Sequence, residues 1–245
     1  MKWFRRAAEQ GHAAAQFSLG FMYAAGQGVQ QDDTEAMKWY RLAADQGDAN
    51  AQLFLGIMYD EGQGVQQDDA EAVKWFRRAA EQGHAAAQFG LGDMYADSRG
   101  VPQDDAEALK WFRRAAEQGF DAAQYRLGFM YAEGQGVPQD ETEAVKWYRR
   151  AAEQGHAAAE ANLGDMYAEG QGVPQDDAEA VKWFRRAAEQ GHAAAQFSLG
   201  TAYDEGRGVP QDQAEAVKWY RLSANQGNTD AQSRLRAWAS RSRRR

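Results

Sequence analysis

The stretch AVKWFRRAAEQGHAAAQF occupies residues 72–89 and recurs unchanged at residues 180–197. The two copies lie three periods of 36 residues apart, and no unit of the chain carries an insertion. Self-similarity at a fixed period of this length is the signature of a repeat protein, in which each unit contacts only its neighbours. Two residue series keep the period from end to end: Trp3, Trp39, Trp75, Trp111, Trp147, Trp183 and Trp219, and Gly11, Gly47, Gly83, Gly119, Gly155, Gly191 and Gly227.

The first half of each unit has the apolar spacing of a helix. In the unit that starts at Gly11, residues Ala15, Leu19 and Tyr23 fall at i, i+4 and i+8. This stripe predicts a helix over about residues 12–25. The glycines of the sequence GQGV that follows it supply the left-handed conformation in which helices end at least cost.

The second half of each unit begins with a capping signal. Asp32 and Glu35 are spaced as a capping box, and Trp39 and Tyr40 follow at helical spacing until Gly47 ends the segment. The unit is therefore a helix–turn–helix, and the chain is predicted to be all-α. We expect one continuous solenoid: a partial repeat helix over residues 1–10, six full repeats over 11–226, and a C-terminal capping helix with a basic tail over 227–245.

Composition excludes several kinds of protein. The absence of cysteine excludes disulfides, zinc-finger sites and thiol nucleophiles. No apolar run reaches the ~20 residues that span a bilayer, and no signal peptide is visible. The chain starts inside a repeat helix, which is expected of a chain truncated at its N-terminus. The compartment therefore stays unknown.

Charge disfavours nucleic acid as the main partner. The net charge is −8, but residues 234–245 hold six arginines and no acid, so the rest of the chain carries −14. Binding nucleic acid depends on neutralising phosphates, which an acidic body does poorly. The sequence RSRRR at 241–245 is interpreted as a frayed tail; binding to nucleic acid or an anionic membrane surface is the alternative.

No group of residues has the pattern of a catalytic or metal site. His12, His84, His156 and His192 lie at least one unit apart, so solvated linkers are favoured over metal ligands. The paired aspartates recur in nearly every unit, where capping explains them. The double arginines, as at residues 77–78, are read as a solvated face of the second helix, with a basic ridge as the alternative. We expect no enzyme activity, cofactor or metal.

The repeat consensus resembles a known family. It reads Ala-x-x-x-Leu-Gly-x-x-Tyr, then Gly-x-Gly-Val, then Ala-x-x-Trp-Tyr/Phe-x-x-Ala-Ala-x-x-Gly, and it is similar to the Sel-1-like repeat (SLR) family of tetratricopeptide-like proteins. The departures are small, with Ser98 for the first loop glycine and Gln30 and Gln66 for proline. The resemblance implies a right-handed α/α superhelix that acts as an adaptor for protein complexes, often in bacteria.

A cysteine-rich subset of that family is linked to β-lactam binding or hydrolysis. A hydrolase acting on β-lactams or the cell wall is therefore the alternative function, although this chain lacks the paired cysteines of the subset. An array selected or engineered for stability, without a native ligand, is the third possibility.

Differences between the units gather on the first helix of each pair. They fall in a series that starts at Phe17, a series that starts at Phe21 and a series that starts at Ala14, which share one helix face because their members are three or four residues apart. We call this the first-helix face; the resemblance implies that it lines a concave groove. The Phe17 series either packs between units or meets a ligand, whereas the Phe21 series is expected to be exposed.

The predicted binding surface takes its residues from these three series. A segment of a protein or peptide with apolar and basic side chains would suit it, and the protein itself is expected to be a monomer. The predicted site residues are Phe17, Phe21, Asn50, Leu53, Ile57, Asp93, Tyr125, Phe129, Asp165 and Thr201.

Overall fold

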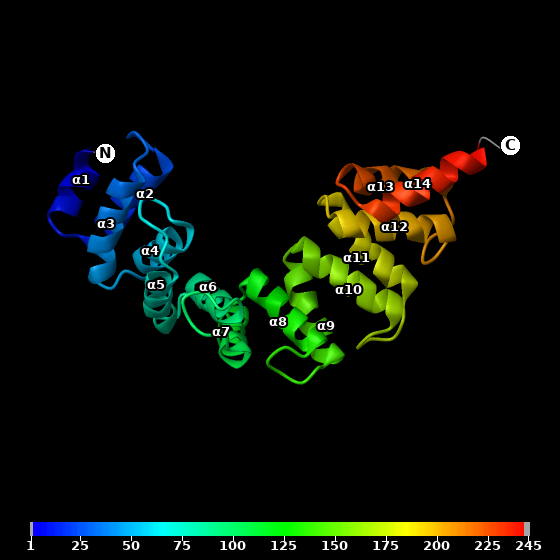
Figure 1. The fold of residues 1–245 in the computed structure, drawn as a ribbon, viewed down its shortest axis with the longest axis horizontal. Helices are drawn as coiled ribbons and strands as arrows, with labels where there is room; N and C mark the ends of the chain where they lie inside the picture. The colour runs from blue at the N-terminus through cyan, green and yellow to red at the C-terminus, as the bar shows by residue number, and fades with distance from the viewer. Residues whose placement is uncertain (1, 243–245) are drawn as a thin grey trace. The chain divides into compact units, whose positions relative to one another are not determined.

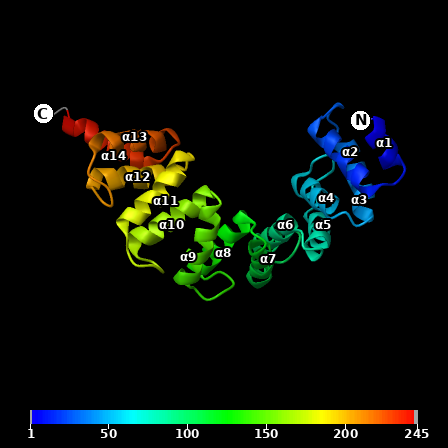
Figure 2. The same ribbon diagram turned by 180° about the vertical axis from the view of Figure 1, so that it is seen from behind.

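The computed structural model describes residues 2–242, and every regular element within that range is an α-helix. Figures 1 and 2 show consecutive helices side by side from α1 to α7 and from α9 to α14. The first helices of the pairs are α2 (Ala13–Ala25), α4 (Ala49–Glu61), α6 (Ala85–Ala96), α8 (Asp121–Glu133), α10 (Ala157–Glu169), α12 (Ala193–Glu205) and α14 (Thr229–Ser242). The second helices are α1 (Lys2–Glu9), α3 (Asp33–Asp45), α5 (Asp69–Glu81), α7 (Asp105–Glu117), α9 (Glu141–Glu153), α11 (Asp177–Glu189) and α13 (Gln213–Asn225).

The all-α fold of 36-residue helix pairs predicted from the sequence is confirmed. The helices form two compact units, Met1–Ala123 and Gln124–Arg245, with the boundary inside α8. Of the basic tail, residues 243–245 lie outside the described part of the chain. None of the described helices has the length and apolar character needed to cross a membrane.

Both glycines of the GQGV loop are explained by geometry. Gly26 caps α2 in the left-handed region with φ 63°, as the sequence predicts. The second loop glycine of a unit lies against the preceding unit: a Cβ on Gly64 would be 2.6 Å from the backbone carbonyl of Asp33. Only a residue without a side chain fits there. Ser98 adopts φ 57° without being glycine, which costs about 1 kcal/mol.

The capping box forms only in part. Asp32 accepts a hydrogen bond from the Glu35 backbone N–H at 2.9 Å, as predicted. The expected return bond from the Glu35 side chain is replaced by an ion pair with Lys38 at 2.5 Å. The Asp32 backbone N–H is instead donated to the Tyr23 carbonyl at 3.1 Å, because the loop folds back onto the end of the first helix.

Close helix packing places the core between the two helices of a pair. A Cβ on Gly20 would come 2.7 Å from the Tyr40 ring, and one on Gly56 would come 2.5 Å from the Phe76 ring. These helical glycines therefore admit the aromatic ring of the second helix, as the sequence predicts from their place inside a helix. Trp111 lies in a buried cluster with residues of α5 and α6, and Trp75 and Trp219 lie in corresponding clusters, so these three tryptophans help to join their units to the preceding ones.

A glutamine near the start of most first helices joins three helices. Gln88 donates a hydrogen bond to the Ala80 carbonyl of the preceding second helix at 3.1 Å. Its side-chain oxygen accepts from Gln118, at the end of its own second helix, at 2.7 Å. The same bonds to a carbonyl eight residues earlier are made by Gln16, Gln52, Gln196 and Gln232. We call this arrangement the glutamine ladder.

Glu160 is the one acidic member of this ladder, and it is 0% exposed. A carboxylate cannot donate to the Ala152 carbonyl, so Arg186 supplies the missing donor at 2.9 Å. Arg186 Nε also pairs with Glu160 Oε1 at 2.8 Å. The fully buried carboxylate is therefore compensated by an arginine from its own unit.

The double arginines contact aromatic rings, which refines the interpretation of a solvated face. The first arginine of a pair reaches the following unit: Arg77 donates to the Tyr95 hydroxyl at 2.8 Å, and Arg185 donates to that of Tyr203 at 2.7 Å. The second lies over the tryptophan of its own helix, as Arg78 does over Trp75 with 4.5 Å to the ring centre. Both contacts stabilise the stack, the second through a cation–π interaction.

Candidate functional site

The Phe17 series packs chiefly against rings of the second helices. Phe17 lies 5.7 Å from Tyr40, Phe89 lies 5.6 Å from Phe112, and Phe197 lies 5.7 Å from Tyr220, measured between ring centres. The predicted site residues Leu53 and Tyr125 of this series are half-buried in the same way. These three ring contacts lie within single units; packing between units, as the sequence suggested, is made by Phe17 with Phe54 at 5.7 Å between ring centres.

The Phe21 series is less exposed than expected. Phe21 is 42% exposed and Asp165 is exposed, but Ile57, Asp93, Phe129 and Thr201 are half-buried. Neighbouring first helices crowd these positions, and Thr201 also accepts a hydrogen bond from the Tyr220 hydroxyl at 3.2 Å. Asp93 is engaged in an interaction within the protein. Among the predicted site residues of the series, Phe21 and Asp165 are therefore the exposed ones.

Asn50, from the Ala14 series, is exposed and lies close to a linker histidine. Its Oδ1 is 3.2 Å from His84 Nε2. The ten predicted residues do not form one described surface: Phe17, Phe21, Asn50, Leu53, Ile57 and Asp93 belong to the first compact unit, and Tyr125, Phe129, Asp165 and Thr201 belong to the second.

In the first compact unit, aromatic rings fill the junction between the first two full repeats. We call Phe17, Phe21, Tyr40 and Phe54 the aromatic cluster. Phe54 stacks on Tyr40 with 5.2 Å between ring centres and 19° between ring planes, and it meets Phe21 edge-on at 6.5 Å. Phe21 therefore presents an exposed ring that is held in place by its neighbours.

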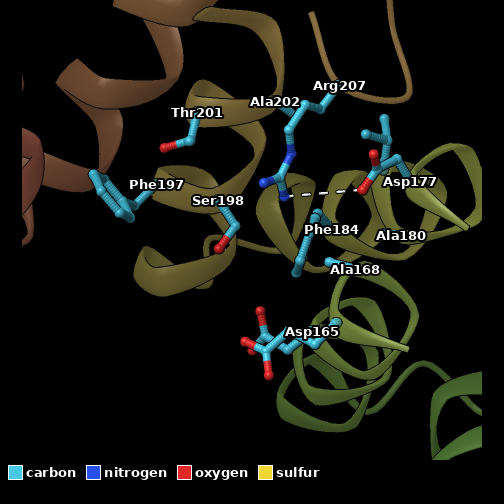
Figure 3. Close-up of a pocket in the computed structure, with 12 residues that line it drawn as sticks. Asp165, Ala168, Asp177, Ala180, Phe184, Phe197, Ser198, Thr201, Ala202 and Arg207 are labelled. Atoms are coloured by element: carbon cyan, nitrogen blue, oxygen red, sulfur yellow. Dashed lines mark ion pairs between the residues drawn. The ribbon is translucent and has the colours of Figure 1, made fainter. Parts of the chain in front are cut away.

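In the second compact unit, the corresponding junction is open. A pocket of about 240 Å³ lies between α10 and α12, above the buried ring of Phe184 on α11. We call it the α10–α12 pocket. Figure 3 shows Asp165 on one side of it and Phe197, Ser198 and Thr201 on the other.

The two junctions correspond position by position, four units apart. Phe17, Phe21, Tyr40 and Phe54 of the aromatic cluster become Ala161, Asp165, Phe184 and Ser198 at the pocket. The pocket thus lacks the equivalents of the Phe17, Phe21 and Phe54 rings, and only the equivalent of Tyr40, the ring of Phe184, remains. The pocket therefore exists because small and polar side chains stand where aromatic rings close the other junction.

The pocket carries an excess of negative charge. Asp165, Glu169 and Asp177 line it together with one cation, Arg207. Asp177 Oδ1 is buried and accepts no hydrogen bond, and Arg207 Nη2 lies 3.9 Å from it (Figure 3). Desolvation, with a smaller contribution from the charge of Glu169, raises the pKa of the Asp165 carboxyl to about 6.

The raised pKa gives a stability prediction for Asp165→Asn. A carboxyl whose pKa is higher in the folded protein favours folding below its unfolded pKa, and that contribution is lost as the pH rises through about 6. Asp165→Asn should therefore raise the free energy of unfolding at pH 7 by about 1 kcal/mol, after allowing for solvent screening of an exposed residue. Urea denaturation of both proteins from pH 4 to pH 8 measures this. Parallel pH profiles would contradict the electrostatic description of the pocket.

The linker histidines have a role that the sequence interpretation missed. His84, His156 and His192 lie at the N-caps of first helices, where Nδ1 accepts the backbone N–H three residues on at 3.4, 3.2 and 3.3 Å. The signal was their place directly before each first helix. Within residues 2–242 no three His, Asp or Glu side chains gather as a metal site would require.

A fourth variable series was also missed. Its members are Ser18, Phe54, Gly90, Arg126, Asn162, Ser198 and Arg234. They vary between units as strongly as the Phe21 series and lie next to the Phe17 series on the first helix. Comparing the units at every position would have found them, and with them Phe54 of the aromatic cluster and Ser198 of the pocket.

Comparison with protein families gives one match that extends over most of the chain. The Sel1 repeat profile matches residues 1–12, 13–48, 49–84, 85–120, 121–156, 157–192 and 193–228. These matches start where the first helices start, so each full match holds one helix pair. The comparison with curated proteins gave no match.

Two solved structures are similar in both sequence and fold. A protective antigen of uropathogenic Escherichia coli with an SLR fold is 45% identical, with a TM-score of 0.91 over 95% of this chain. This chain spans 50% of the length of that protein. A Sel1 repeat protein from Oxalobacter formigenes is 37% identical, with a TM-score of 0.79 over 87% of this chain and 86% of its own.

Proposed function

This chain belongs to the Sel1 repeat family, and from that premise we propose that it is a scaffold that binds a protein or peptide segment on its first-helix face. Proteins built from Sel1 repeats generally serve as protein–protein interaction scaffolds. For this chain the proposal also names the binding surface: the ligand contacts residues of the variable series on the first helices, not the residues that are identical from unit to unit.

The proposal rests on one contrast: the contacts that hold the repeats together are the same in most units, whereas the first-helix face differs between units. Helix caps, loop glycines, the glutamine ladder and the arginine–aromatic contacts recur from unit to unit. Accessible side chains that differ between units lie on the first helices, where Phe21 offers an exposed ring and Asp165 an exposed carboxylate. A surface that served only self-packing would need neither group. On the second helices, the exposed Leu42 and Leu222 also differ from the arginine of other units, so the test below includes a second-helix control.

The proposed ligands have apolar and basic side chains, and each compact unit offers its own contact. In the first unit an apolar side chain would contact Phe21 and Phe54 of the aromatic cluster; in the second a basic side chain would face Asp165. Asp93, the other acid of the Phe21 series, already has an interaction within the protein. Asp165 is therefore the acid that we expect to attract a basic ligand side chain. Charges at the rim would act mainly on the association rate.

Peptide display against the intact chain, repeated with Asp165→Lys, tests the proposal. The variant should weaken binding of the selected peptides and reduce its salt sensitivity, with helicity unchanged by circular dichroism. Glu189→Lys is the matched control, because it makes the same charge change at an exposed position on the second helix α11. If both variants bind equally well, or if only Glu189→Lys weakens binding, the first-helix face is not the binding surface.

The alternative of a β-lactam or cell-wall hydrolase has no observation in its favour. The aspartate pairs act as helix caps, as Asp68 does for the Glu71 N–H at 3.0 Å, so they are already used structurally. We expect no catalysis. Turnover of a chromogenic β-lactam by the pure protein would overturn this expectation.

A further inference from the structure

We propose that the α10–α12 pocket receives the side chain of one lysine or arginine of the bound segment. This inference rests on the proposed function and deepens it, because it assigns one subsite of the first-helix face to one kind of side chain. Three features of the pocket carry it: its walls, its charge and its relation to the closed junction.

The walls of the pocket suit an aliphatic stem. Phe184 forms the base, Phe197 stands on the α12 side, and Ala168 and Ala180 complete the apolar lining. Both lysine and arginine have apolar stems that pack on such surfaces while the charged head stays near water. Asp165 at the α10 side of the pocket is exposed, so a charged head beside it would stay in contact with solvent.

The charge of the pocket lacks a matching cation. Neither Asp165 nor Glu169, both on α10, forms an ion pair or hydrogen bond with any of the residues that the structure describes. The one cation of the lining, Arg207, is directed to Asp177 and to Glu205, at 3.9 and 4.0 Å. A cationic head from a ligand would therefore find two free carboxylates, with the Ser198 and Thr201 hydroxyls on the opposite wall.

The closed junction shows that the pocket is a local departure rather than a property of the repeat. With Phe17 and Phe54 in place, the same backbone frame buries the ring of Tyr40 completely. At the pocket the equivalent positions hold Ala161, which is buried in the core beside Phe184, and Ser198, which lines the pocket. Refilling it with the chain's own residue types is therefore compatible with the fold.

The predicted pH dependence follows from the groups that face the pocket. These are Asp165 and Glu169 on α10, Asp177 on α11 and Arg207 after α12. A bound cation requires ionised Asp165, whose pKa is raised to about 6 in the free protein. Binding should therefore weaken about tenfold between pH 7.5 and pH 5.

The test uses four small probes followed by NMR on the isotope-labelled full chain. Nα-acetyl-lysine methylamide and Nα-acetyl-arginine methylamide represent the two cationic side chains, and the norleucine and citrulline analogues are their neutral counterparts. The cationic probes should shift the amide signals of Asp165, Ser198 and Thr201 saturably, with a roughly millimolar Kd. The neutral analogues should bind at least about tenfold more weakly. The stronger of the two cationic probes identifies the preferred residue.

Two variants make the result specific to the pocket. Ala161→Phe/Ser198→Phe refills the space, and Asp165→Asn removes a charge while keeping the shape; each should weaken the cationic probes at least about tenfold. Unchanged circular dichroism shows that a variant is folded, and Asp165→Asn decides the question if the refilled variant is not. Equal binding of neutral and cationic probes, or unchanged binding by folded variants, overturns the inference.

Failure here is distinguishable from failure of the proposed function. If display yields peptides whose binding maps to the aromatic cluster, while no cationic probe binds the pocket, the scaffold proposal stands and this inference is wrong. If display yields no peptide but the probes bind, the pocket is a cation site and the broader proposal is wrong.

Discussion

Trp111→Ala should lower the free energy of unfolding by about 3–5 kcal/mol, whereas Trp3→Ala should lower it by less than about 1 kcal/mol. The two residues occupy the same place in the repeat. Trp111 is 7% exposed and joins α7 to α5 and α6, whereas Trp3 on α1 is 78% exposed. Urea denaturation monitored by circular dichroism gives both values.

The pair of tryptophan variants tests how the stack is held together. In a nearest-neighbour array the value of a side chain depends on whether the adjacent unit is present. Equal losses for Trp111→Ala and Trp3→Ala would contradict that description. A loss at Trp111 well below the stated range would place the main stabilisation within single helix pairs.

Gln196→Glu should be strongly destabilising, by about 3–5 kcal/mol, because it buries a carboxylate without a cation. The substitution removes the side-chain amide of Gln196, which donates a hydrogen bond to the Ala188 carbonyl. No arginine can replace this donor, because Leu222 stands in this unit where Arg186 stands in the unit of Glu160. Gln88→Glu should cost much less. Its unit offers Arg114 at the equivalent position, where it lies 4.6 Å from the centre of the Trp111 ring, much as Arg186 lies over Trp183.

The reverse change completes this comparison. Glu160→Gln restores the ladder donor and removes a buried ion pair, so it should be neutral or slightly stabilising. Denaturant unfolding at pH 7 orders the three variants. If Gln196→Glu and Gln88→Glu cost the same, Arg186 does not compensate Glu160 in the way that the geometry indicates.

Most of the fold could be predicted from the sequence because its signals are local. A helix, its N-cap and its terminal glycine lie within a few residues of one another, so the stripe through Leu19 and the cap at Asp32 predict α2 and α3 directly. Because the same signals recur every 36 residues, a chance match to a helix pattern is excluded. The half-formed capping box escaped prediction because the carbonyl of Tyr23, which takes the Asp32 N–H, is placed there by the loop.

The contacts that join helices could be predicted less well. The ladder bond between Gln118 and Gln88 spans 30 residues, and the bond between Arg77 and Tyr95 joins two units. Neither follows from helical spacing. Glu160 was nevertheless visible in the sequence as the single acid in a series of glutamines, and it would have indicated a buried charge.

The candidate site was predicted in part. The sequence located the variable positions on the first helices, but it treated the Phe21 series as uniformly exposed. It also could not show that Asp165 and Ser198 line the same space above Phe184, because these residues come from different units. A difference in side-chain size between units indicates a pocket only when residues that contact each other in the fold are compared together.

The most direct test of the scaffold proposal is hydrogen–deuterium exchange of the intact chain with and without a peptide selected by display. The proposal predicts that peptide binding slows amide exchange in first helices, above all α2 and α4 around the aromatic cluster and α10 and α12 around the pocket. Exchange in the second helices should change little. Protection concentrated in α3, α5, α9 or α11, with none in the first helices, would contradict the proposal that the variable first-helix face binds the partner.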